Sequence, residues 1–266
     1  MKKLLALLSI VAACILPASS HAGSSNAANP VLPAAKVAAF SNRVQQDLAA
    51  RGANVAIVAR VGRDPSLLPE GIRYTHVAFW VYSDIQQPNG QRGRGYRVYN
   101  LYQRNGDLTR SDLIQDRPVD FFAAAQRLDA GVIIPDPRLQ QQLLDVITSP
   151  TYAALHNPTY SVLANPGSAQ FQNCTEHTLD VLMAALYDTS DPRQIKANIV
   201  AHFQGQEVRL NGLQRLFAPA ASRALTTADH GSVVRTATFG SIARFMDAHD
   251  LADLTYRITP DRLVRY

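Results

Sequence analysis

The chain has 266 residues, of which 47% are hydrophobic and 18% are charged. This composition is typical of a globular protein and excludes a disordered chain, a collagen and a long coiled coil. The formal net charge is +5, and the arginines between residues 92 and 110 are scattered rather than gathered in one run. We therefore expect no nucleic-acid partner, because such a partner requires a dense basic surface.

The first 22 residues have the pattern of a secretory signal peptide. Lys2 and Lys3 precede an apolar run over 4–16, and small residues stand at Ser20 and Ala22, where a signal peptidase cleaves. The apolar run is shorter than the ~20 residues that cross a membrane. The sequence therefore predicts a periplasmic or secreted protein.

The two cysteines of the chain are Cys14 and Cys174. The run 11–14 (VAAC) also fits a lipoprotein signal, in which a lipidated Cys14 would anchor the protein to a membrane. With either leader, Cys174 is the remaining thiol of the mature chain. A solitary cysteine in an exported protein is either an inert apolar side chain or a reactive thiol.

After a linker over 23–33, the pattern predicts one α+β domain over 34–266 with a helical C-terminal extension. Strands are expected early and helices late. Hydrophobic periodicity and turn residues predict, in chain order, a helix over 34–50, a strand over 54–60, a hairpin of 74–82 and 96–103 around Pro88-Asn89-Gly90, a helix over 118–128, a helix over 137–147, a strand over 160–163, helices over 174–187, 192–203, 210–217 and 241–249, and short strands near 233 and 254.

Cys174 stands at the start of a predicted helix, with Asn173 as its N-cap. The helix dipole and the unpaired N–H groups of the first turn favour a thiolate and can hold an oxyanion. His76 is the candidate base, because a lone histidine in an apolar strand needs a partner. Asn100, on the neighbouring strand between two large apolar residues, is the candidate that orients the imidazole.

Other interpretations of these residues stay open. His177 lies one helical turn after Cys174 and is a second candidate base, while Glu176 fits a dipole or capping role. A zinc site at Cys174 and His177 lacks further ligands at suitable spacing, so we expect no metal and no cofactor. A redox-sensing thiol has no resolving cysteine in the mature chain.

The run FQNCTEHT at 171–178 resembles the signature of an exported bacterial family known only as a domain of unknown function. More remotely, the order of His76 in a strand, Asn100 in the next strand and Cys174 at a helix start is similar to the circularly permuted NlpC-type peptidases and the lecithin:retinol acyltransferase group. That resemblance implies a papain-like fold, with an antiparallel sheet packed against the helix that bears the cysteine. It also implies Cys174 as nucleophile, His76 as base and acid, and Asn100 as orienter.

Two functions follow from these expectations. One is an exported cysteine-dependent amide or ester hydrolase or acyltransferase, acting on cell-wall peptides or on lipid and lipoprotein acyl groups. The other is a non-catalytic periplasmic binding or assembly factor on the same fold.

Overall fold

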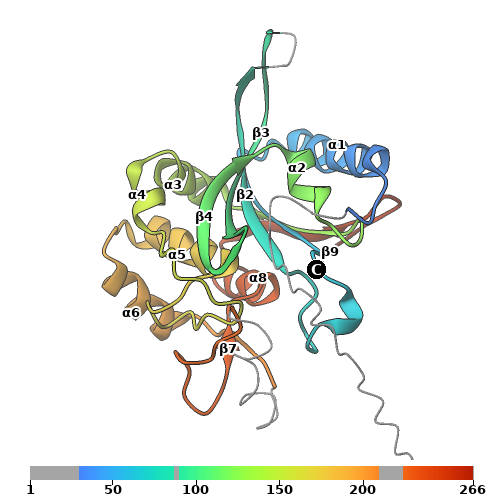
Figure 1. Ribbon diagram of the computed structural model, residues 1–266. Coiled ribbons are helices and arrows are strands. Elements are labelled where there is room, and N and C mark those ends of the chain that lie inside the picture. The colour runs from blue at the N-terminus through green and yellow to red at the C-terminus, as the bar shows by residue number, and fades with distance from the viewer. Residues whose placement is uncertain (1–29, 87–89, 210–223, 266) are drawn as a thin grey trace, which may run out of the picture.

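The computed structural model describes residues 30–86, 90–209 and 224–265 (Figure 1). The predicted signal peptide over 1–22, the linker up to residue 29, the turn residues Pro88 and Asn89, and the predicted helix over 210–217 lie outside the described residues. In the described ranges, no helix has the length and apolar character required to cross a membrane.

The core is one antiparallel sheet of seven strands in the order β4-β3-β2-β1-β5-β8-β9. Its strands are β1 (Val55–Arg60), β2 (His76–Gln86), β3 (Arg92–Arg104), β4 (Asp107–Asp116), β5 (Ala130–Pro135), β8 (Ala252–Ile258) and β9 (Leu263–Arg265). A separate pair is formed by β6 (Gln206–Glu207) and β7 (Arg235–Thr236).

Helices cover both faces of the sheet (Figure 1). One face is covered by α1 (Ala34–Ala50) and α2 (Pro118–Ala123). The opposite face is covered by α3 (Pro137–Ile147), α4 (Pro150–Ala154), α5 (Cys174–Tyr187), α6 (Pro192–His202) and α8 (Phe239–Ala248). A short 3-10 turn, η1 (Pro65–Leu67), lies between β1 and β2.

The central strands are apolar on both sides because both faces are covered. In β2, Val77 and Phe79 pack on the side of α5, whereas Ala78 and Trp80 pack on the side of α1 and α2. Every residue of β1 is buried. This two-sided burial explains why these strands read as continuous apolar runs rather than as alternating ones.

The expected α+β class is confirmed, and the helices predicted over 34–50, 137–147 and 174–187 begin and end at those residues. The predicted hairpin is β2 and β3. Two expectations differ from the structure: helix α2 ends at Ala123 and not at residue 128, and the predicted strand over 160–163 is one bridge between Tyr160 and Gln172. The strands expected near 233 and 254 correspond to β7 and β8, and β9 adds a further strand to the main sheet.

Candidate functional site

The first turn of α5 is capped by the residue predicted to cap it. The Oδ1 atom of Asn173 accepts a hydrogen bond from the N–H of Glu176 at 2.9 Å, and its Nδ2 atom donates to the carbonyl of Val162 at 3.1 Å. Asn173 therefore satisfies a backbone donor of the first turn and ties the helix to the loop before it. Cys174 is fixed as the first helical residue.

The thiol of Cys174 lies against the backbone of β2 at the position of His76. Its Sγ atom is 4.0 Å from the carbonyl oxygen of Thr75 and 3.7 Å from Oγ1 of Thr175, and the N–H of Val77 also hydrogen-bonds it. Thr75 and Val77 are the two residues that flank His76. Folding therefore brings a cysteine from position 174 to the strand residues around position 76.

His76 and Asn100 meet as the sequence suggests. The Nε2 atom of His76 lies 3.0 Å from Oδ1 of Asn100. The Asn100 amide group donates to the carbonyl of Val98 at 3.5 Å and to the carboxylate of Asp116 at 3.3 Å, which leaves its Oδ1 atom for the imidazole. Nε2 therefore carries the proton, and Nδ1 is the basic nitrogen. Among the described residues, Nδ1 has no hydrogen-bond partner.

Tyr102 and Asp116 hold the pair of His76 and Asn100 in place. The Tyr102 ring stacks on the His76 ring, with centroids 4.6 Å apart and planes 13° from parallel. The hydroxyl of Tyr102 donates to Asp116 at 2.8 Å, so Asp116 accepts hydrogen bonds from both Asn100 and Tyr102. The imidazole is held in its plane and in one tautomer.

Arg60 lies on β1 directly opposite His76 and is almost fully buried, at 1% exposed. Its guanidinium carbon stands 5.4 Å from the centre of the Phe121 ring, and its Nε and Nη1 atoms have no hydrogen-bond partner in the described part of the chain. Burial, followed by the positive charge of Arg60, holds the pKa of His76 well below its usual value. The imidazole is therefore neutral at physiological pH.

Burial also raises the pKa of the Cys174 thiol. The Val77 N–H, the Thr175 hydroxyl and the charge of Arg60 oppose this shift. With a neutral imidazole and a protonated thiol, the resting site holds no thiolate–imidazolium pair. Arg60 was not identified from the sequence, although an arginine that ends an apolar strand is a signal that could have drawn attention to it.

The structure does not join all three predicted residues. The His76 ring packs against Phe121 of α2, whereas Cys174 belongs to α5, which covers the other face of the sheet. No hydrogen bond links Sγ to the His76 ring within the described ranges. A proton transfer between them therefore requires a rearrangement of these side chains.

His177 is a packed core residue. Its Nε2 atom lies 3.3 Å from the carbonyl of Tyr152, its ring meets the Tyr152 ring edge to face, and burial lowers its pKa to about 3. Among the described residues, no three His, Cys, Asp or Glu side chains gather as metal ligands would.

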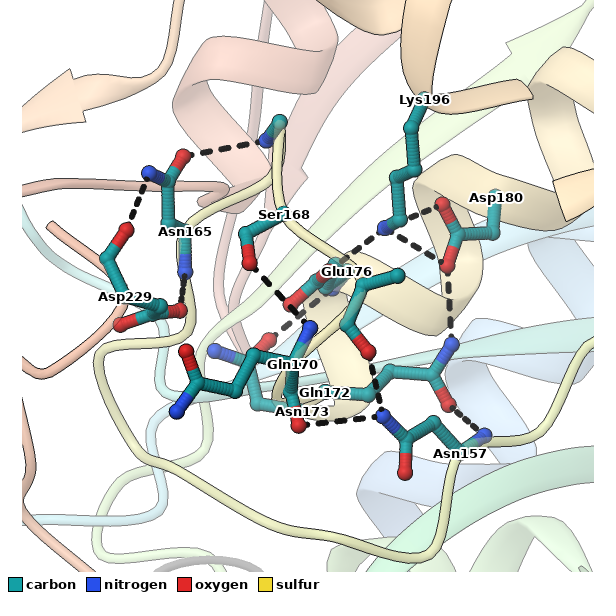
Figure 2. Close-up of polar contacts among 12 residues, drawn as sticks. Asn157, Asn165, Ser168, Gln170, Gln172, Asn173, Glu176, Asp180, Lys196 and Asp229 are labelled. Atoms are coloured by element: carbon teal, nitrogen blue, oxygen red, sulfur yellow. Dashed lines mark hydrogen bonds and ion pairs between the residues drawn. The ribbon is translucent and has the colours of Figure 1, made fainter. Parts of the chain in front are cut away.

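Behind the thiol, Glu176 belongs to a buried ionic cluster that the sequence did not reveal (Figure 2). Lys196 of α6 places its Nζ atom 2.6 Å from Glu176 and 2.8 Å from Asp180, and Gln172 donates to Asp180 at 2.8 Å. Two carboxylates at positions i and i+4 of an apolar helix were the available signal, because buried carboxylates require a cation.

A cavity of about 170 Å³ opens beside Cys174. Its apolar wall is formed by Leu68, Pro69, Ile72, Val162, Leu163, Leu225 and Ala237. Arg63, Tyr160, Asn173 and Thr175 also line it. The cavity therefore reaches the start of α5.

Comparison with known proteins places these residues in a family. Residues 47–246 match the model of a family described as an uncharacterized protein conserved in bacteria, DUF2145. No curated protein and no solved structure matches the chain. Since the match spans well over half of the chain and includes His76, Asn100 and Cys174, the chain belongs to this bacterial family.

Proposed function

We propose that the protein is an exported cysteine-dependent hydrolase or acyltransferase of amides or esters, with a permuted papain-like arrangement of its site. The observation that supports this most strongly is the imidazole of His76. Asn100 fixes its tautomer with Nδ1 basic and unpartnered, on the strand whose backbone touches the Cys174 sulfur.

In the proposed reaction, Nδ1 of His76 takes the proton of the Cys174 thiol, and the sulfur forms a bond to the substrate carbonyl carbon. The backbone N–H groups at the start of α5 stabilise the oxyanion. The carbonyl re-forms as the bond to the leaving amine or alcohol breaks, and His76 gives that group its proton. Water or an acceptor alcohol or amine then attacks the thioester carbonyl carbon and loses its proton to His76. The carbon–sulfur bond breaks, the acyl product leaves, and His76 returns the proton to the sulfur, which restores the thiol and the neutral imidazole.

The accessible substrates follow from the expected compartment. Cell-wall peptides offer amides, and lipids or lipoproteins offer acyl esters and amides. The buried charge of Arg60 adds to the proposal, because it stabilises the thiolate and keeps the imidazole in its basic form.

The proposal is tested by alkylation of Cys174 with iodoacetamide. We expect the native protein to react slowly near neutral pH and faster as pH rises, since the thiol pKa is raised, and Cys174→Ala to take no label. His76→Ala and Asn100→Ala should each slow the reaction at least tenfold at pH 7, because both remove the oriented base. Equal alkylation rates in wild type, His76→Ala and Asn100→Ala would show that His76 does not act as the base for Cys174.

A second function has an observation in its favour. Cys174 is only 6% exposed and makes no hydrogen bond to the His76 ring in the described chain, which suits a non-catalytic periplasmic binding or assembly factor. Turnover of acyl esters and cell-wall peptides by wild type but not by Cys174→Ala supports the enzyme. Equal cellular function of both proteins supports the binding factor.

A further inference from the structure

Among the described residues that line the cavity beside Cys174, Arg63 is the charged one. It follows β1 in the chain and is partly buried. Its Nη2 atom is shielded from solvent and has no hydrogen-bond partner among the described residues. A partly buried guanidinium with an unpaired nitrogen costs free energy, and an anion in the cavity would lower that cost by neutralising the charge of Arg63.

Tyr160 connects this arginine to the nucleophile. The Tyr160 side chain packs in one apolar cluster with Cys174, and the charge of Arg63 acts on its hydroxyl. Arg63 and Cys174 therefore both act on one tyrosine, and both line the same cavity. A ligand in the cavity would face both.

The remaining wall selects for an aliphatic ligand. Leu68, Ile72, Val162 and Leu163 line it, and no acidic residue lines it in the part of the chain that the structure describes. An aliphatic chain would bury its apolar surface there and gain the free energy of its removal from water. A volume of about 170 Å³ admits a short chain and excludes a long fatty-acyl chain.

We infer that this cavity is the acyl subsite and that it takes a short aliphatic acyl group carrying a carboxylate. The scissile carbonyl lies at Cys174, and the carboxylate forms an ion pair with the Arg63 guanidinium. This inference rests on the proposed function, since the position of the scissile carbonyl assumes that Cys174 attacks it.

The test measures binding without the thiol. The full chain with Cys174→Ala is titrated by calorimetry with the half-amides of succinate, glutarate and adipate, and with the corresponding diamides as neutral probes. We expect at least one half-amide to bind at least tenfold more tightly than its diamide. Adding Arg63→Gln should abolish that preference, whereas Arg193→Gln, at a side chain 94% exposed, should leave it unchanged.

Equal binding of half-amides and diamides, or no binding of either, would overturn the inference. A preference that survives Arg63→Gln, or tighter binding of methyl phosphate than of the best half-amide, would overturn it as well. Circular dichroism and thermal melting of each variant establish that it is folded. Because the titrated protein lacks the thiol, failure of the alkylation test and failure of this test are separate results.

Discussion

Removal of the Lys196 ammonium group should destabilise the protein strongly, and Lys196→Met is the variant that tests this. Lys196 is 13% exposed and contacts two carboxylates that are almost inaccessible to solvent, Glu176 at 2.6 Å and Asp180 at 2.8 Å (Figure 2). Methionine fills a similar volume but supplies no charge. Each carboxylate would then be left buried without its cation.

The magnitude follows from the cost of breaking a buried ion pair. Removing one partner costs about 3–5 kcal/mol, because the other charge stays in a medium of low dielectric constant. For a domain of this size each kcal/mol lowers the melting temperature by about 2–4 °C, so the variant should melt roughly 6–20 °C below wild type. Arg193→Met, on the same helix but exposed, should change stability by about 0.5 kcal/mol or less.

The free energy of unfolding that Lys196→Met loses should depend on pH, and the pKa shifts of the two carboxyls give the direction of this dependence. Burial already raises the pKa of Glu176 and of Asp180, and loss of Lys196 raises both further. A carboxyl whose pKa is raised by folding contributes stability below its unfolded value of about 4, and that stability is lost as pH rises through the folded value. The deficit of Lys196→Met should therefore be small near pH 4 and grow toward pH 8.

Urea denaturation of wild type, Lys196→Met and Arg193→Met between pH 4.5 and 8 measures these differences. A triple variant that adds Glu176→Gln and Asp180→Asn to Lys196→Met should recover at least half of the lost free energy, because neutral amides replace the stranded charges. A deficit below about 1 kcal/mol at pH 7, or one that does not change with pH, would refute the reasoning.

Two further predictions concern the residues around the thiol. Asn173→Ala should cost about 1 kcal/mol more than Asn173→Ser in urea denaturation, because both variants lose the bond to Val162 but only serine keeps the cap on the Glu176 N–H; equal losses would exclude the cap. Arg60→Met should leave the free energy of unfolding within about 1 kcal/mol of wild type, raise the pKa of His76 in an NMR titration and slow alkylation of Cys174. A loss of about 3 kcal/mol or more would mean that the buried guanidinium is well paired.

Local sequence determined the elements whose signals lie within one segment. Helices α1, α3 and α5 have one buried stripe or a capping residue, so their periodicity and their ends were visible. The hairpin of β2 and β3 could also be predicted from its own segment of sequence, and the contact between His76 and Asn100 follows from that hairpin. The position of Cys174 at the start of a helix also follows from its neighbours.

Other elements could not be predicted from local sequence. Strand β5 is buried on both sides of the sheet, so its six residues show no alternation, and it pairs with β1 and β8 from distant parts of the chain. Strand β4 is largely polar because it forms the edge of the sheet. Neither pattern separates a strand from a loop or a helix segment by periodicity alone.

Only the tertiary structure decided the surroundings of the thiol. It placed the Cys174 sulfur on the backbone of β2, buried it, and set the charge of Arg60 beside it. It also supplied Lys196 from α6 to neutralise Glu176. These contacts join segments that lie far apart in the chain. Their effects depend on burial, because burial shifts the pKa of a side chain and raises the free energy of a charge. The neighbours of a residue in the sequence do not specify how deeply it is buried.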